Sequence, residues 1–92
     1  MKIAKTHAET AAFLPFEQAR ITLARPAARL HVRDGQGRLY VDTPPAAGRT
    51  VRFTVRGAAG RHVAQALDAA GHLLEEAAFR LAPRTNLACD AR

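Results

Sequence analysis

RHVAQALDAAGHLLEEAAFRL, residues 61–81, decides the fold because it fits two secondary structures. As one Ala-rich helix, it spaces its apolar side chains three and four residues apart on residues of good helix propensity. As a hairpin, it forms two strands that meet at a D-A-A-G turn at residues 68–71. The helix would give an α+β domain, and the hairpin would give an all-β domain.

Three observations favour the hairpin. Gly71 would lie in the middle of the helix, where it costs about 1 kcal/mol relative to Ala. The helical stripe also leaves Phe79, the largest apolar side chain of the stretch, on the polar side, whereas in an extended chain Phe79 and Leu81 share one face. Finally, a second D-x-x-G occurs at residues 34–37, and Asp followed by a left-handed Gly is a hairpin turn signal.

The other strands are predicted from alternation of apolar and polar residues. Residues 29–33 and 38–42 alternate on either side of the D-G-Q-G turn, residues 50–56 alternate strictly, and residues 18–24 fit a further strand. About six to seven short strands separated by turn signals predict a small antiparallel β-sandwich. Its predicted core consists of Ile21, Leu23, Leu30, Val32, Leu39, Val41, Val51, Phe53, Val55, Leu67, Phe79 and Leu81.

The two ends of the chain are expected to lie outside the sandwich, which spans residues 18–83. Residues 1–17 contain the T-x-x-E spacing of a capping box, which predicts a short helix. The alternative is an extended leader whose two phenylalanines cover one end of the core. Residues 84–92 are expected to form a tail or the start of a linker.

The composition is that of one small folded domain. The 92 residues leave room for a single modest core, and 48% hydrophobic with 24% charged residues argues against disorder. The formal net charge of +6 suits a polyanionic partner, but the twelve arginines are spread along the chain and form no basic tail. Cys89 is the single cysteine, which excludes an internal disulfide, and no run approaches the roughly 20 apolar residues of a membrane span. We therefore expect a cytoplasmic protein with no membrane segment.

The last third of the chain carries a series of strand-end motifs: G-R-H at residues 60–62, L-D-A-A-G at 67–71 and F-R-L-A-P-R-T at 79–85. This series resembles the immunoglobulin-like or fibronectin-III-like accessory domain that precedes an (α/α)-barrel catalytic domain in some bacterial carbohydrate-active enzymes. The resemblance implies an immunoglobulin-like sandwich that packs on a catalytic domain, with P-x-T beginning the linker. The chain departs from that arrangement because no catalytic domain follows the motifs within its 92 residues.

No residue pattern indicates catalysis, a metal or a cofactor. The chain has no serine, which excludes a Ser-His-Asp triad. Glu75 and Glu76 are adjacent and would lie on opposite faces of a strand, so they cannot act as a pair across one bond. The spacing of metal ligands is missing among the four histidines, His7, His31, His62 and His72. We therefore expect no catalytic residue, no cofactor and no metal.

One outer face of the hairpin at residues 29–42 gathers basic residues around the single tyrosine. Tyr40 is expected to project into solvent there, where an arginine would stack on its ring. The plain alternative is that such residues only decorate the solvent side of a sheet. The candidate contact face comprises Arg29, His31, Arg33, Arg38, Tyr40, Arg52 and Arg56.

These features predict a non-catalytic accessory or interaction domain that packs on another protein domain or subunit through a basic face. Self-association through edge strands remains an alternative kind of contact. The other function class is a small basic nucleic-acid-binding domain. Nucleic-acid binding would weaken steeply as salt rises, which separates it from the first function. Its phosphate contacts would come from Arg33, Arg38, Arg52 and Arg56.

Overall fold

The structure is a computed structural model that describes residues 1–5 and 8–83. Within these ranges the chain forms eight strands and no helix. The contested stretch is an antiparallel hairpin of β7 (Gly60–Leu67) and β8 (Leu73–Leu81). The all-β prediction is therefore confirmed, and the α+β alternative with a helix over residues 61–81 is wrong. The described residues contain no helix that is long and apolar enough to cross a membrane.

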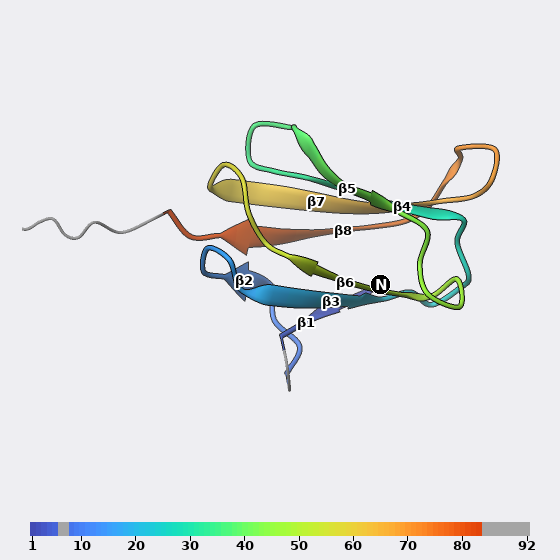
Figure 1. The fold of residues 1–92 in the computed structure, drawn as a ribbon, viewed down its shortest axis with the longest axis horizontal. Helices are drawn as coiled ribbons and strands as arrows, with labels where there is room; N and C mark the ends of the chain where they lie inside the picture. The colour runs from blue at the N-terminus through green and yellow to red at the C-terminus, as the bar shows by residue number, and fades with distance from the viewer. Residues whose placement is uncertain (6–7, 84–92) are drawn as a thin grey trace, which may run out of the picture.

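The strands form two sheets packed as two layers (Figure 1). The smaller sheet has the order β1-β3-β6, with β1 (Lys2–Ala4), β3 (Gln18–Thr22) and β6 (Thr50–Thr54). The larger sheet has the order β2-β8-β7-β4-β5, in which the further strands are β2 (Ala12–Phe13), β4 (Arg29–Arg33) and β5 (Leu39–Thr43). Every neighbouring pair is antiparallel except β2 and β8, which are parallel.

The core lies between the two sheets, where every strand except β5 contributes fully buried residues and β5 contributes half-buried ones. Nine of the twelve predicted core residues are buried; the exceptions are Leu39, which is 41% exposed, and Val41 and Leu67, which are half-buried. The prediction favoured large side chains and missed small or N-terminal ones. The additional buried apolar residues are Ile3, Ala4, Phe13, Ala19, Ala64 and Ala66.

Residues 1–17 contribute two strands to the sandwich, and their described part contains no helix, so the short helix is wrong. β1 extends the smaller sheet and β2 extends the larger one. Phe13 is 1% exposed and packs edge to face on Phe79, with ring centroids 5.4 Å apart. Phe16 is 61% exposed, so one of the two leader phenylalanines fills the core. The predictions for residues 84–92 lie outside the described residues.

The two D-x-x-G turns have the same hydrogen bonds, which confirms them as hairpin turns. In the first, Gly37 N donates to Asp34 O at 2.9 Å; in the second, Gly71 N donates to Asp68 O at 3.0 Å. In each turn the Asp Oδ1 atom accepts from the backbone N–H groups two and four residues later. Gly37 and Gly71 have φ values of 81° and 86°, a region that glycine occupies without steric cost.

Candidate contact surfaces

The structure distributes the residues of the predicted contact face over both sheets. Arg29, His31 and Arg33 alternate with buried residues of β4 and therefore lie on the outer face of the larger sheet. Arg52 lies on the outer face of the smaller sheet, on the opposite side of the sandwich. Arg38 is exposed beside the first turn. These residues do not form one continuous surface.

Tyr40 is partly buried against the core, which corrects its predicted orientation toward solvent. The register of β4 and β5 shifts after Val32, and Tyr40 is the extra residue of the resulting β-bulge. The bulge also explains why Leu39 is exposed, because it reverses the alternation on the turn side of Tyr40. The prediction rested on strict alternation, which a bulge interrupts without a distinct sequence signal.

The Tyr40 ring packs between the core and an arginine. Its centroid lies 6.1 Å from that of Phe53 and 5.6 Å from the Arg56 Cζ atom. The Arg56 Nη2 atom donates to the Tyr40 carbonyl oxygen at 3.3 Å. Burial raises the pKa of the Tyr40 hydroxyl above its ordinary value, and the negative charge of Asp34 adds to the increase. The arginine over the Tyr40 ring is thus Arg56, which follows β6, and not one of the hairpin arginines beside which Tyr40 was predicted to lie.

His62, at the start of β7, is fully buried and bonded through both ring nitrogens. Its Nε2 atom lies 2.7 Å from the Ala58 carbonyl oxygen, and its Nδ1 atom lies 2.8 Å from the Tyr40 hydroxyl. A carbonyl only accepts, so the proton belongs on Nε2, and Nδ1 accepts from the tyrosine. The bond from His62 Nε2 to the Ala58 carbonyl joins β7 to the loop that precedes it.

Asp34 holds the same loop from the other side and is 7% exposed. Its Oδ1 atom accepts from Gln36 N at 2.9 Å and from Arg38 N at 3.0 Å, and its Oδ2 atom accepts from Ala58 N at 3.0 Å. The backbone bonds, Ala58 first, lower the pKa of the Asp34 carboxyl. Ala58 is thus held at its N–H by Asp34 and at its carbonyl by His62. The polar atoms of Asp34, His62 and Tyr40 thus bond to one another or to nearby backbone groups, which indicates a structural role. We call these three residues the clasp.

One end of the outer face of the larger sheet is electrostatically compensated. Asp42 Oδ1 lies 2.6 Å from Arg29 Nε and 3.1 Å from His31 Nε2. The bond from Arg29 is the main reason that the pKa of Asp42 is lowered. Arg29 is the only arginine in residues 1–5 and 8–83 with a carboxylate within 4.0 Å.

The other end of this face carries two arginines without such partners. The register of β7 and β8 sets Arg61 directly opposite Arg80. Neither side chain makes a hydrogen bond or ion pair with the described part of the chain. A shallow hollow of about 390 Å³ adjoins them, lined by Ala11, Ala12, Arg61, Ala78, Phe79 and Arg80. The sequence analysis missed this pair, because the register of the hairpin shifts between Ala66 and Leu67, and a plain count outward from the turn would set Arg61 opposite Phe79.

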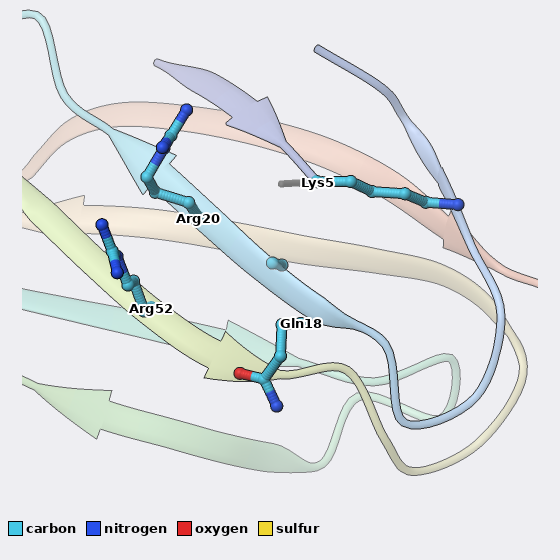
Figure 2. Close-up of a pocket in the computed structure, with 5 residues that line it drawn as sticks. Lys5, Gln18, Arg20 and Arg52 are labelled. Atoms are coloured by element: carbon cyan, nitrogen blue, oxygen red, sulfur yellow. The ribbon is translucent and has the colours of Figure 1, made fainter. Parts of the chain in front are cut away.

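The outer face of the smaller sheet carries a second cross-strand pair, Arg20 opposite Arg52. Figure 2 shows the two side chains lying side by side and leaning the same way along their strands, away from Gln18. A hollow of about 250 Å³ lies next to them, lined by Lys5, Gln18, Ala19, Arg20 and Arg52. As at the first pair, no hydrogen bond or ion pair links either arginine side chain to the described residues.

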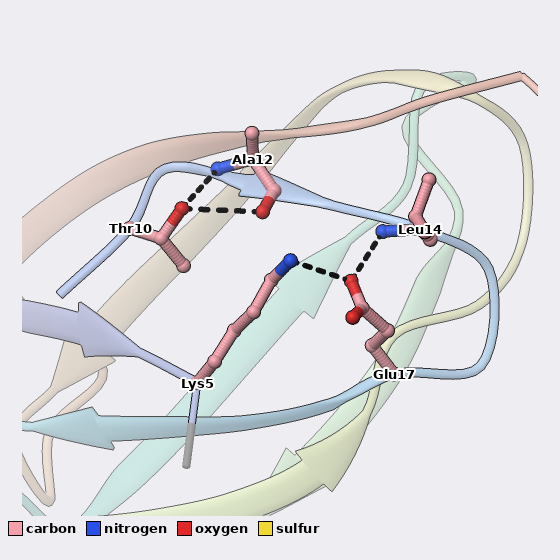
Figure 3. Close-up of polar contacts among 5 residues, drawn as sticks. All are labelled: Lys5, Thr10, Ala12, Leu14 and Glu17. Carbon is pink, nitrogen blue, oxygen red and sulfur yellow. Dashed lines mark hydrogen bonds and ion pairs between the residues drawn. The ribbon is translucent and has the colours of Figure 1, made fainter. Parts of the chain in front are cut away.

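Lys5 and Glu17 are already engaged beside this second pair (Figure 3). The Lys5 Nζ atom lies 2.8 Å from Glu17 Oε1, which also accepts from Leu14 N at 2.6 Å. These bonds, the backbone bond from Leu14 first, lower the pKa of Glu17. Thr10 holds the backbone of Ala12 in the neighbouring segment, accepting from its N–H at 3.1 Å. Glu17 is therefore committed to Lys5 and to the backbone.

The histidines are placed individually. His31 contacts Asp42, His62 belongs to the clasp, and His72 lies 3.3 Å from Asp68. In residues 1–5 and 8–83, no group of three or more His, Cys, Asp or Glu side chains could hold a metal ion. His7 and Cys89 lie outside the described residues.

Comparison with known proteins gives no match to a protein family, to a curated protein or to a solved structure. The function of the chain is therefore inferred from the geometry and charge of its surfaces.

Proposed function

We propose that the chain is a non-catalytic interaction domain that packs on another protein domain or subunit through the outer face around Arg61 and Arg80. One observation carries the proposal: two like charges lie directly opposite each other, with no carboxylate partner among the described residues, beside an exposed apolar hollow. Like charges in directly opposed positions destabilise a sheet, so the isolated domain gains nothing from the pair. An acidic partner surface would remove the repulsion.

The composition of this face fits the centre of a protein interface. Arginine is enriched in such centres and among the residues that dominate binding energy, whereas most other charged residues are depleted there. Ala11, Ala12 and Ala78 line the hollow and supply apolar surface. A carboxylate on the partner would form paired hydrogen bonds with either guanidinium group.

The sheet edges support docking through a face over self-association by strand pairing. The edge strands β1, β2, β5 and β6 have three, two, five and five residues. β5 also contains the bulge at Tyr40, and Pro44 follows it directly. Short strands, bulges and prolines all discourage the addition of a further strand.

The sandwich is proposed to be immunoglobulin-like. Its strand order corresponds to an immunoglobulin arrangement, with β3 and β6 in one sheet and β8, β7 and β4 adjacent in the other. His62 supports the same assignment, because its bond to the Ala58 carbonyl resembles the tyrosine corner at the start of the sixth immunoglobulin strand.

Association with a bacterial carbohydrate-active enzyme is the more specific form of the proposal. It is supported by the strand-end motifs, of which G-R-H at residues 60–62 and the Phe79–Pro83 part of the last motif fall at the ends of β7 and β8. The partner would then be the catalytic domain or subunit of that enzyme.

The four arginines proposed for nucleic-acid contact are separated. Arg33 and Arg52 lie on opposite outer faces, and Arg56 is held against Tyr40. A phosphate backbone needs a continuous basic track, so this separation favours the protein contact.

Site-specific photo-cross-linking tests the proposed function. A photoreactive residue at position 78 should capture one discrete acidic protein in the source cells, while the same residue at the exposed position Gln36 should not. The captured protein is then purified and its binding measured directly. Equal labelling from both positions, or capture of nucleic acid from position 78, would refute the protein contact.

A further inference from the structure

We propose a second binding site on the outer face of the smaller sheet, which takes a small oxyanion, phosphate or sulfate, between Arg20 and Arg52. This site goes beyond the protein contact because it lies on the other layer of the sandwich. The anion is either free or the terminal ester of a small molecule.

The outer face of the smaller sheet consists of basic, hydroxyl and amide side chains together with one alanine. The side chains that alternate outward from β1, β3 and β6 include no carboxylate. The acid on this side of the sheet is Glu9, which bridges to Ala4 beyond the edge of β1, so that Ala4 separates it from Arg20. Its members are Lys2, Ala4, Gln18, Arg20, Thr22, Thr50, Arg52 and Thr54.

The pairing register arranges these donors in adjacent rows. Arg20 and Arg52 form one row, and the next row contains Lys2, Thr22 and Thr50. Figure 2 shows Arg20 leaning toward the arrowhead of its strand, at which Thr22 lies, and Arg52 leaning the same way. The two guanidinium groups are thus directed toward a row that contains an ammonium group and two hydroxyl groups.

The chemistry of the donors selects the ligand. A guanidinium group presents a planar fork of N–H donors that matches the oxygens of phosphate or sulfate. Two such forks side by side neutralise a dianion and are relieved of mutual repulsion when it binds. Gln18 is oriented away from this position and donates to Thr54 Oγ1 at 2.7 Å.

The neighbouring hollow gives an ester room for its organic part. It is lined by Arg20 and Arg52 themselves, and by Gln18 and Ala19. Lys5 also lines it, but its ammonium group is paired with Glu17 and lies 5.5 Å from the Phe13 ring centroid. The Lys5 ammonium group is therefore already paired with a carboxylate, and it does not draw the anion away from Arg20 and Arg52.

Nuclear magnetic resonance titration of the full chain tests the site. The probes are inorganic phosphate, inorganic sulfate and glucose 6-phosphate, each added at constant ionic strength. We expect saturable shifts in the amide signals of residues 18–22 and 50–54, with a dissociation constant below about 10 mM. Tighter binding of the ester identifies the hollow as part of the site, whereas equal affinities identify the anion alone as the ligand; both support the proposal.

Two matched variants separate a site from general attraction. R20Q/R52Q and R61Q/R80Q remove the same charge from cross-strand arginine pairs on different sheets. We expect R20Q/R52Q to weaken binding at least about tenfold and R61Q/R80Q to leave it unchanged. Shifts that do not saturate, or equal losses in both variants with their folded spectra intact, would overturn the proposal.

Discussion

Asp34 and Asp68 occupy the same position in the same kind of turn, yet their surroundings give them different roles. Both accept two backbone N–H groups within their own turn. Asp34 also accepts from Ala58 N and is buried, whereas the second carboxylate oxygen of Asp68 lies 3.3 Å from the exposed His72. One aspartate closes a turn, and the other also fastens a distant loop.

The substitution Asp34→Asn should therefore cost more stability than the matched Asp68→Asn. An asparagine amide keeps one acceptor oxygen, but in D34N the NH₂ group would face a backbone N–H group, and two donors cannot bond to each other. We expect the free energy of unfolding to fall by about 2–3 kcal/mol for D34N and by about 1 kcal/mol or less for D68N. Urea unfolding measures both, and equal losses would show that the clasp contributes nothing beyond the turn.

The Asp34 contribution should also depend on pH. Its folded-state pKa lies below the ordinary value of 3.8, so folding favours the ionised carboxylate. The stabilisation is present in full above that ordinary value and is lost as the pH falls through the lower folded-state pKa. The stability difference between the wild type and D34N should be largest near neutral pH and shrink below about pH 4. A difference that stays constant down to pH 2 would contradict this.

Among the elements, the two hairpins show why the first turn contains a second glycine. A Cβ atom at Gly35 would lie 1.9 Å from the Ala59 carbonyl oxygen, because the turn packs against the loop before β7. The equivalent position of the second turn is Ala69, which is exposed. The two turns thus differ at their second residue: Gly35 packs against the loop before β7, whereas Ala69 is exposed to solvent.

Replacing Gly35 by alanine and Ala69 by glycine should change the free energy of unfolding by unequal amounts. G35A must displace the turn or the loop, and we expect it to destabilise the fold by about 2–4 kcal/mol. A69G changes only an exposed position, and we expect about 1 kcal/mol or less from the greater freedom of the unfolded chain. Thermal unfolding of both variants checks this, and a G35A protein as stable as A69G would show that the turn and loop are not in contact.

Most of the strand elements could be predicted from the sequence because one buried face imposes a period of two. The prediction was wrong at Leu39 and Tyr40, where a bulge changes the period, and in residues 1–17, where β1 and β2 are too short to show alternation. Short edge strands are defined by pairing with distant residues. Ile3 and Phe13 are buried by such pairing, and no pattern in the neighbouring sequence predicts their burial.

The arginine pairs could not be recognised from the sequence for a related reason. Arg20 and Arg52 lie far apart in the chain and meet through the register of β3 and β6. The predicted contact face instead grouped residues by nearness in the sequence and combined opposite surfaces.

At the scale of the whole molecule, the carboxylates are largely committed elsewhere. Asp34 and Asp68 serve turns, Glu17 pairs with Lys5, and Glu75 lies 2.7 Å from the α-amino group of Met1. Arg29 is the one arginine of the described ranges that is paired with an acid. Each outer face of the sandwich thus carries a cross-strand pair of arginines that no carboxylate of the described residues neutralises.

If the arginine pairs serve binding, removing them should not weaken the fold. We expect R20Q/R52Q and R61Q/R80Q to be as stable as the wild type or more stable by about 0.5 kcal/mol at low salt, because each removes an opposed like-charge pair. This gain in stability should decrease as the salt concentration rises, because salt screens the repulsion between the two arginines. Urea titrations at two salt concentrations check this, and a loss above about 1 kcal/mol would assign the pairs a structural role.

The most direct test of the proposed protein contact is the affinity of the cross-linked partner for three proteins: the wild type, R61E/R80E and R20E/R52E. The two variants reverse the same charge on different faces, so they separate a defined interface from overall electrostatic attraction. Isothermal titration calorimetry should show binding weakened at least about tenfold by R61E/R80E and less than about threefold by R20E/R52E. Equal weakening by both variants, or unchanged affinity in R61E/R80E, would contradict a docking face centred on Arg61 and Arg80.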